Sequence, residues 1–463
     1  MRRTLSCLLL AGSTVFPILA LAQPTELQAR AEQLARQAQA ESLAYDIVES
    51  LTTEVGPRLA GSEAEARARD WAVAKFRELG FRNVRIEPFA LPVWERGREI
   101  AEIVAPFPQA LTITALGGSV ATGEEGVSGE VLAVASVAEL EATPAEALKG
   151  RIVFVDEVMT RTQDGSGYGV AAAKRRLAAY LAAEKGALAV LIRSVGTSSH
   201  RFAHAGQMRR VTEPGDDPGV PAAALAAPDA DQLQRILGRG EPVRMRLVLT
   251  PRTRAEGTSG NVVAEIPGHH AADEIVLVGA HLDSWDLGTG AVDDGAGVAI
   301  VTAAAKYQMD ALKGGPQRTL RVVLFGAEEV GLAGAKAYAE RHADELGNHV
   351  AALESDFGAD RIWRFDTGAS EATLAAAQAL GVPLRGFGVG PGNNNARGGP
   401  DLKYVREAGV PVFTLLQSGW DYFDLHHTAD DTLDKVDPEA LAQNVAVYTA
   451  VLYQLLNSEV TFR

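Results

Sequence analysis

The stretch from His281 to Gly297, "HLDSWDLGTGAVDDGAG", combines a histidine, four aspartates and several glycines directly after the apolar run "EIVLVGA". Aspartate and glycine are turn residues, so a solvated loop is one interpretation of this composition. Metal binding is the other, because imidazole nitrogen and carboxylate oxygen are both zinc ligands. His281 and Asp283 are two residues apart, and in an extended chain this spacing points both side chains to the same side.

The segment before this stretch favours a binding site. The run "EIVLVG" has the continuous Val, Ile and Leu content of a parallel strand that is buried on both faces. In open α/β sheets, ligands bind outside the carboxyl ends of such strands. We therefore expect His281 and Asp283 at the edge of a sheet where ligands bind.

Other apolar runs also end in residues that can bind a metal. The run "TLRVVLFGAEE" ends in Glu328 and Glu329, and "HVAALESDFG" carries Asp356 after its apolar part. Acids at the start of a helix are an alternative explanation for the glutamate pair, since they interact favourably with the helix dipole. Near the C-terminus, "YFDLHHTADDTLDKVD" adds His426 and His427. Donors that meet at one edge, with one shared carboxylate, suffice for two divalent ions that activate water for hydrolysis.

The order of these motifs, H-x-D, D-D-G-A-G, A-E-E-x-G-L-x-G and H-H-T-x-x-D-T, resembles the M28 family of dinuclear zinc aminopeptidases and carboxypeptidases. The chain looks most similar to the carboxypeptidase Q (plasma glutamate carboxypeptidase) branch, whose members act on small peptides with a free amino end. The resemblance implies a metallo-exopeptidase of aminopeptidase or dipeptidase type that hydrolyses terminal bonds of short unblocked peptides.

The resemblance also implies a role for each site residue. Two Zn²⁺ per chain would be held by five ligands: His281, Asp293, Glu329, Asp356 and His427. Asp293 would be the bridging carboxylate, Glu328 the general base, and Asp283 the partner that orients His281. His427 is preferred to His426 because the family places the ligand directly before Thr or Ser. The family commonly has a cis peptide after the bridging aspartate, so we expect one between Asp293 and Asp294.

The chain as a whole is that of an exported globular protein. Its 463 residues are 47% hydrophobic, which is enough for two or three domains with large cores. Residues 1–22 have the basic start, apolar run and small-residue end of a secretory signal peptide, which predicts a periplasmic or extracellular location. No other segment is apolar enough for stable membrane insertion. The only cysteine, Cys7, lies in this signal, so the metal ligands must be His, Asp or Glu.

The pattern of predicted elements indicates an α/β fold. The resemblance implies a mixed, largely parallel sheet flanked by helices, the zinc-dependent exopeptidase fold. We assign residues 23–95 and 256–463 to this peptidase domain. Residues 96–255 contain many short strands and are expected to form an inserted β-rich domain, which resembles protease-associated domains in "LKGRIVFV" and "EKGALAVLIRS". Only "YGVAAAKRRLAAYLAAEKGA" and "DADQLQRIL" look helical there, and residues 24–55 have helical periodicity.

The ligands alone leave open a dinuclear hydrolase of another amide or ester. A single-zinc transferase of the glutaminyl cyclase kind and a non-catalytic receptor-like relative share this type of scaffold. The complete ligand set and the inserted segment argue against both. The net charge of −15 argues against nucleic acid as a partner, and small peptides are the expected substrates. The resemblance also implies a homodimer, and His200 and His204 are expected to be structural.

Overall fold

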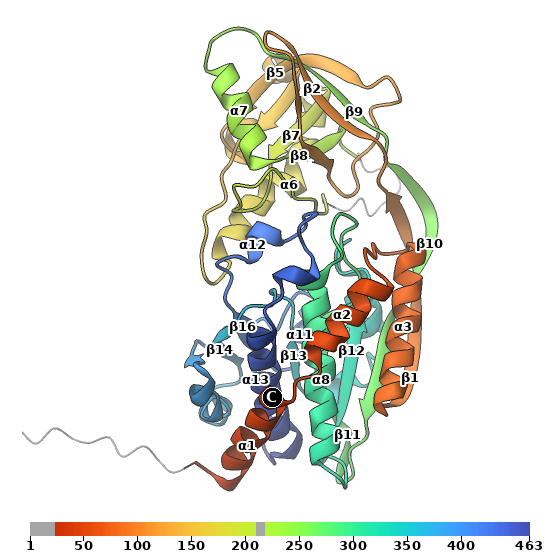
Figure 1. Cartoon of the computed structure of the whole chain (residues 1–463), viewed down its shortest axis with the longest axis vertical. Coiled ribbons are helices and arrows are strands. Elements are labelled where there is room, and N and C mark those ends of the chain that lie inside the picture. The colour runs from red at the N-terminus through yellow and green to blue at the C-terminus, as the bar shows by residue number, and fades with distance from the viewer. Residues whose placement is uncertain (1–23, 210–217) are drawn as a thin grey trace, which may run out of the picture.

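The computed structural model describes residues 24–209 and 218–463, and the predicted signal peptide of residues 1–22 lies outside them. The described residues form two lobes, each built around one eight-stranded sheet (Figure 1). The lower lobe in Figure 1 contains the first and last parts of the chain, and the upper lobe contains the middle. Two long strands, β1 (Arg82–Glu95) and β10 (Arg252–Ile266), pair antiparallel and connect the lobes.

The sheet of the lower lobe has the order β1-β10-β12-β11-β13-β16-β14-β15. Its four central strands, β12, β11, β13 and β16, are parallel to one another. Strand β10 pairs antiparallel with β1 and β12, and β14 pairs antiparallel with β16 and parallel with β15. The remaining bounds are β11 (Ala271–His281), β12 (Arg318–Phe325), β13 (His349–Glu354), β14 (Ile362–Gly368), β15 (Gly390–Pro391) and β16 (Val412–Gln417). The predicted mixed α/β fold, with parallel strands at its centre, is therefore confirmed.

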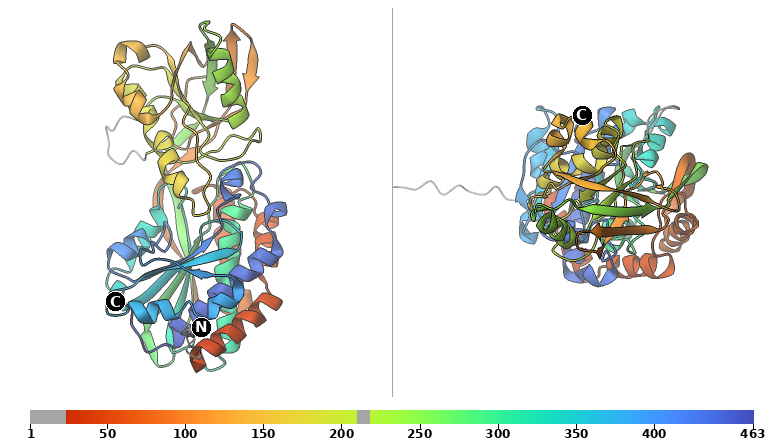
Figure 2. Two further views of the ribbon diagram at one scale, coloured as in Figure 1. Left: turned by 90° about the vertical axis from the view of Figure 1, so that its left-hand side faces the viewer. Right: turned by 90° about the horizontal axis from the view of Figure 1, so that it is seen from above.

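Helices cover both faces of this sheet because its strands are apolar on both faces (Figure 2). Val276 and Val278 pack into one hydrophobic cluster, and Leu277 between them packs into another on the opposite face. One face is covered by α1 (Glu26–Ala40), α2 (Ala44–Glu54), α3 (Glu63–Leu79), α8 (Ala296–Ala311) and α13 (Pro438–Asn457). The other face carries α9 (Ala333–Arg341) and α11 (Lys403–Glu407). The short helices α10 (Leu374–Ala379) and α12 (Tyr422–Leu425) lie in connections.

The predicted helical stretch of residues 24–55 is interrupted once. Helix α1 ends at Ala40 and α2 begins at Ala44, where the side chain of Ser42 accepts the backbone N–H of Ala44. Such a local side-chain bond offers the backbone an alternative to the helical ladder. Periodicity alone does not reveal a break of this kind.

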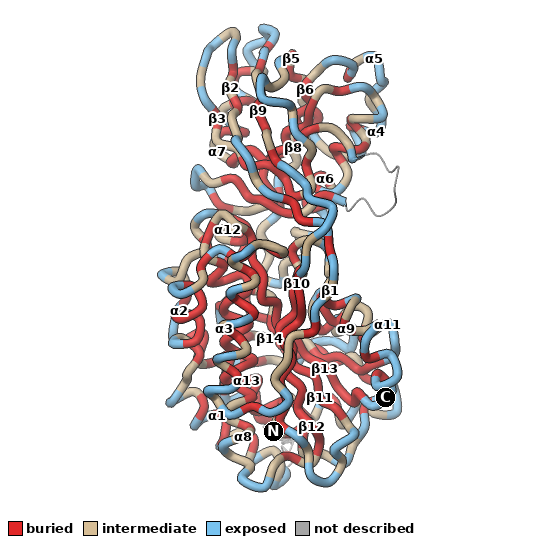
Figure 3. The backbone as a smooth tube through the Cα atoms, turned by 90° about the vertical axis from the view of Figure 1, so that its right-hand side faces the viewer, coloured by how far each residue is buried: buried red, intermediate tan, exposed pale blue. Residues whose placement is uncertain are grey.

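The sheet of the upper lobe has the order β3-β2-β9-β5-β6-β7-β8-β4 and lies within the range assigned to an inserted domain. Its strands are β2 (Glu99–Ala105), β3 (Gln109–Leu111), β4 (Ile113–Ala115), β5 (Val127–Val134), β6 (Ile152–Val155), β7 (Ala189–Arg193), β8 (Ala222–Leu225) and β9 (Arg244–Leu249). In Figure 3 the buried segments include central strands of both lobes, such as β11 and β6.

The upper lobe contains more helix than the sequence indicated. The two expected helices are α6 (Ser166–Glu184) and α7 (Ala227–Leu237). Two additional short helices, α4 (Val137–Ala142) and α5 (Ala145–Leu148), precede α6. Helix α4 begins after Ser136, whose side chain accepts the N–H of Glu139. A helix of one or two turns held by such a cap has too few residues to show a periodic pattern.

Candidate metal centre

The parallel strands of the lower lobe bring the predicted ligands to one edge. Residue His281 at the end of β11 is in register with Phe325 of β12, so Glu328 and Glu329 follow at the same level. Gly279 of β11 is in register with Glu354 of β13, two residues before Asp356. Strands of equal direction and matched register end side by side, which is why residues far apart in sequence meet here.

One group of donors surrounds His281. Its Nε2 atom lies 3.1 Å from Oδ1 of Asp293 and 3.5 Å from Oδ1 of Asp356. Its Nδ1 atom lies 2.9 Å from the carbonyl oxygen of Asp283, an arrangement in which Nδ1–H donates and Nε2 is left free to bind a metal. All of these side chains are almost completely enclosed.

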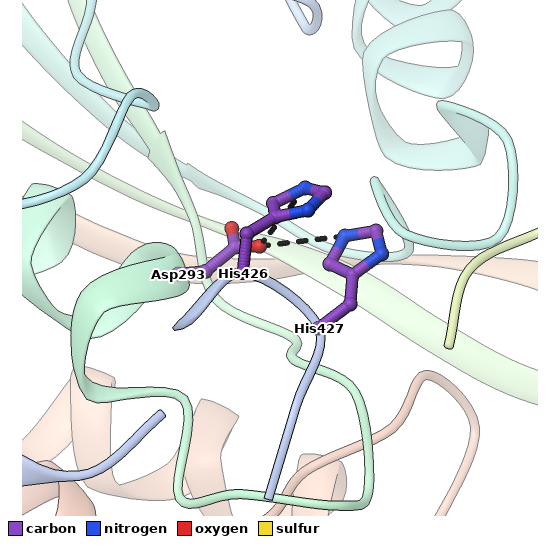
Figure 4. A group of neighbouring side chains, drawn as sticks. All are labelled: Asp293, His426 and His427. Carbon is purple, nitrogen blue, oxygen red and sulfur yellow. Dashed lines mark ion pairs between the residues drawn. The ribbon is translucent and has the colours of Figure 1, made fainter. Parts of the chain in front are cut away.

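A second group surrounds the other oxygen of Asp293. Nε2 of His427 lies 3.4 Å from Oδ2 of Asp293 and 3.0 Å from Oε2 of Glu329. Nε2 of His426 lies 3.6 Å from the same Oδ2 atom, and Figure 4 shows both rings beside the Asp293 carboxylate. Because His427 contacts Glu329 as well as Asp293, the spacing favours His427 as the ligand of this group.

The donor spacing fits metal ions of zinc size. Donors about 2.0–2.2 Å from a tetrahedral zinc are ~3.3–3.6 Å apart, close to the separations within both groups. Three buried polar atoms of the cluster have no hydrogen-bond partner: Oδ2 of Asp293, Oε1 of Glu329 and Nδ1 of His426. Unpaired buried polar atoms are costly, so bound cations give the two carboxylate oxygens a favourable role.

The electrostatics of the cluster also match a cation site. Burial raises the pKa of Asp293, and burial together with the Asp293 charge raises the pKa of Glu329. Burial lowers the pKa of both His426 and His427, so their rings are neutral and have a lone pair for a metal. Several carboxylates are thus crowded into a desolvated region, and divalent ions would neutralise them.

Asp283 and Glu328 are linked through the backbone. The carboxylate of Asp283 accepts the N–H of Glu328 at 3.1 Å and the N–H of Glu329 at 3.3 Å. The same carboxylate is 3.8 Å from Nδ1 of His281, so Asp283 orients that ring through its carbonyl rather than through its side chain. Burial, which outweighs the attraction of His281, raises the pKa of Glu328 to about 8.

The sequence analysis missed two residues that support the centre. Asp431 accepts the N–H groups of Val292 and Asp293 at 2.6 and 3.2 Å, and it stands in the H-H-T-x-x-D-T motif that was already quoted. Arg58, which is fully buried, donates to the carbonyl groups of Leu282 and Gly290 at 2.6 and 2.9 Å. The motif could have revealed Asp431, whereas no pattern around Arg58 pointed to it.

The segment that carries the two histidines is bonded to the upper lobe. His427 has a positive φ of 62°. Its Nδ1 atom lies 3.2 Å from the carbonyl oxygen of Ala205, and its carbonyl oxygen accepts the N–H of Ala205 at 2.9 Å. Nδ1 of His204 lies 2.8 Å from the carbonyl oxygen of His426. The buried His204 is therefore a structural residue as predicted, and the ring of His427 is oriented from the other lobe.

The peptide bond between Asp293 and Asp294 is cis, as predicted from the family resemblance. Asp294 itself lies in a possible donor group with His281 and Asp356. Its carboxylate, however, accepts the N–H of His281 at 3.0 Å and the N–H of Gly297 at 3.1 Å. These bonds give Asp294 a role in holding the backbone of the site.

The donor groups open into a cavity of about 750 Å³ that lies between the lobes. Asp293, Glu328 and His427 line it from the lower lobe. Tyr168 and Arg175 of α6 line it from the upper lobe. Among residues 24–209 and 218–463, no helix is long and apolar enough to cross a membrane.

Comparison with known proteins agrees with the fold and the motifs. The sequence model of peptidase family M28 matches residues 261–452. Carboxypeptidase Q of Rattus norvegicus is 34% identical over 415 residues, which cover 90% of this chain and 85% of that protein. The crystal structure of a peptidase M28 precursor from Shewanella amazonensis SB2B is 52% identical with a TM-score of 0.91, and the match covers 94% of this chain and 98% of that one.

A more distant structure has the same fold. The zinc aminopeptidase BSAP of Bacillus subtilis is 21% identical with a TM-score of 0.66, over 90% of this chain and 95% of that one. The relatives therefore match both lobes and not the motif-bearing segment alone. The chain belongs to peptidase family M28 and is a metallo-exopeptidase.

Proposed function

We propose that the chain is an exported dinuclear zinc exopeptidase that hydrolyses the terminal bond of short peptides with a free amino end. The observation that carries this proposal is the shared carboxylate of Asp293, whose two oxygens face His281 and His427 at 3.1 and 3.4 Å. The ligands would be His281, Asp293, Glu329, Asp356 and His427. Zinc is favoured because the donors are histidines and carboxylates at tetrahedral spacing, and because a solved relative is a zinc aminopeptidase.

Two bound zinc ions would supply Lewis acidity and lower the pKa of a bound water. The residues of the chain supply the rest. Glu328 lines the cavity beside the donor groups, and the hydrogen bond from its N–H to Asp283 fixes its backbone. In this position its carboxylate would accept a proton from the attacking water and return it to the leaving amine.

The size of the cavity supports short substrates. A volume of about 750 Å³ is in the range of pockets that enclose small organic ligands. The upper lobe closes one side of it, so we propose that residues 96–255 form an inserted domain that limits substrate length. The peptidase domain would then consist of residues 23–95 and 256–463. We further propose export through the signal in residues 1–22, and a homodimer.

The test is the variant Glu328→Gln, assayed with metal content measured on the same sample. We expect both zinc ions to remain and the rate to fall by about 10²–10⁴-fold, the usual share of general acid–base catalysis. Substrates should include a dipeptide, a tripeptide, an N-blocked dipeptide and a peptide of about ten residues. Full activity of Glu328→Gln would refute the assigned base, and equal cleavage of the N-blocked or long peptide would refute the substrate class.

A further inference from the structure

Arg175 carries a buried positive charge that the proposed mechanism does not use. It lies on α6 of the upper lobe, lines the cavity, and is only 7% exposed. One nitrogen, Nη2, donates to the hydroxyl of Tyr168 at 2.5 Å, and the guanidinium lies 5.3 Å from the centre of that ring. Nε and Nη1 have no hydrogen-bond partner among the residues that the structure describes.

No carboxylate among residues 24–209 and 218–463 forms an ion pair with Arg175. Arg321, by comparison, is also buried and pairs with Glu265 at 2.8 Å. Burying a cation without a counter-charge is unfavourable, because the charge loses part of its solvation. The unpaired N–H groups of Arg175 are therefore available to an anionic group that enters the cavity.

The backbone around Arg175 leaves room for its guanidinium. Gly206 has a φ of +133°, and a Cβ atom there would lie 2.3 Å from Nη1. Any larger residue at position 206 would displace the charged group. Tyr168, which holds Nη2, stacks on Phe423 at 4.9 Å and packs edge-on against His426 at 5.1 Å. The guanidinium is thus fixed at the border of the metal centre.

The lining of the cavity contains groups of both charges. The metal donors and Glu328 are acidic. Six cationic side chains also line the cavity, Arg175, Arg176 and Arg209 from the upper lobe and Arg397, Lys403 and Arg406 from the lower lobe. A ligand that carries a negative charge a short distance from a peptide bond would match both kinds of group.

We propose that Arg175 binds the free α-carboxylate of a short peptide substrate while the scissile bond lies at the metal donors. The inference rests on the proposed function and adds to it a second anchoring group, at the carboxyl end of the substrate. Guanidinium groups bind carboxylates by charge-assisted hydrogen bonds. A long peptide would place an uncharged amide at this position and leave Arg175 unpaired.

The competing role for Arg175 is contact with the reacting carbonyl oxygen, which every substrate has. The two roles differ in their dependence on the carboxylate. The experiment therefore compares a dipeptide with its C-terminal carboxamide, in the zinc-loaded wild-type enzyme and in Arg175→Met. Arg239→Met is the matched control, because Arg239 is an exposed residue of the upper lobe outside the cavity lining.

For the dipeptide, we expect Arg175→Met to lower kcat/KM by about 30- to 1,000-fold, the usual loss for a buried charge pair, with most of the effect in KM. For the carboxamide, the change should be less than about threefold. Arg239→Met should match the wild type on both. Equal losses on both substrates would overturn the proposal and assign Arg175 to the carbonyl oxygen.

Equilibrium binding tests the same point without turnover. Calorimetry would use a dipeptide analogue whose peptide bond is reduced to an amine, with either a free carboxylate or a carboxamide. The wild type should prefer the carboxylate form, and Arg175→Met should lose this preference. If the wild type hydrolyses no peptide, the proposed function fails, but this binding preference still decides the role of Arg175. Retention of the preference in a folded Arg175→Met protein, as judged by thermal melting, would refute it.

Discussion

Replacing Asp424 by asparagine should weaken zinc binding at the site that contains His427, although Asp424 is not a ligand. The carboxylate of Asp424 accepts two hydrogen bonds from Arg161 of the upper lobe, at 2.6 and 2.8 Å. It accepts a third from the hydroxyl of Thr197 at 2.7 Å. These bonds hold the chain three residues before His427 against the lobe whose Ala205 orients the ring.

The size of the effect follows from these contacts. Hydrogen bonds to charged groups contribute about 1.5–3 kcal/mol each. The side chains of Arg161 and Asp424 are 34% and 25% exposed, so solvent screens the pair and a total near 2 kcal/mol is reasonable. At 1.4 kcal/mol for each factor of ten, this corresponds to about 30-fold in zinc affinity at one site. Loss of groups that orient a metal ligand commonly costs 10- to 100-fold, which brackets this value.

The measurement is competition for zinc with a coloured chelator of graded strength. Asp424→Asn should release one of two zinc ions to the chelator at lower concentration than the wild type and keep the other. Asp421→Asn is the control, because Asp421 contacts the same arginine at 3.1 Å but is 86% exposed. If the two variants retain zinc within about threefold of each other, the upper lobe does not position His427.

Three more predictions test the metals, a buried charge and the assembly. Asp293→Asn should lose both zinc ions on dialysis, whereas Asp356→Asn should keep one, because only Asp293 faces both donor groups; elemental analysis checks this. Burial lowers the pKa of Lys174 to about 8 from an ordinary value of 10.5, so between these pH values the unfolded chain binds more protons and stability rises with pH. In urea unfolding at pH 7, Lys174→Met should therefore be more stable than the wild type by on the order of 3 kcal/mol. This difference in stability should shrink towards pH 10.5. The control Lys313→Met, at an exposed lysine, should show no such dependence on pH. Light scattering at micromolar concentration should give a dimer, and a strict monomer would contradict that proposal.

The sequence could indicate where the proposed ligands lie, because several of them follow strand-like apolar runs, while their individual roles came from the family resemblance. Apolar runs of strand length identified β11, β12 and β13, and each is followed by residues that can bind a metal. Parallel strands in matched register carry those residues to one edge, so His281, Glu329 and Asp356 meet without any long-range information beyond the fold. The motif before Thr428 distinguished His427 from His426, and the 3.0 Å contact with Glu329 favours the same choice.

The supporting contacts were not predictable in the same way. Ala205 contacts His427 through its backbone, and every residue type has a backbone carbonyl, so the residue type at position 205 does not indicate this contact. Arg58 donates to carbonyl groups more than 220 positions away, and its own segment shows only a turn. The unpaired state of Arg175 is a property of its whole surroundings. Only a three-dimensional structure reveals that no carboxylate of the described residues pairs with Arg175.

The contacts of Ala205 link the two lobes to the metal centre energetically. The ring and backbone of His427 are bonded to the upper lobe, while Asp293 and Glu329 stand on the lower one. A zinc ion held by all three therefore binds best when the lobes have this relative position. By thermodynamic linkage, the two effects have the same free energy: the relative position of the lobes strengthens zinc binding by the amount by which bound zinc stabilises that relative position. Because Arg175 also stands on the upper lobe, a metal ion bound as proposed would also hold the proposed carboxylate anchor in place.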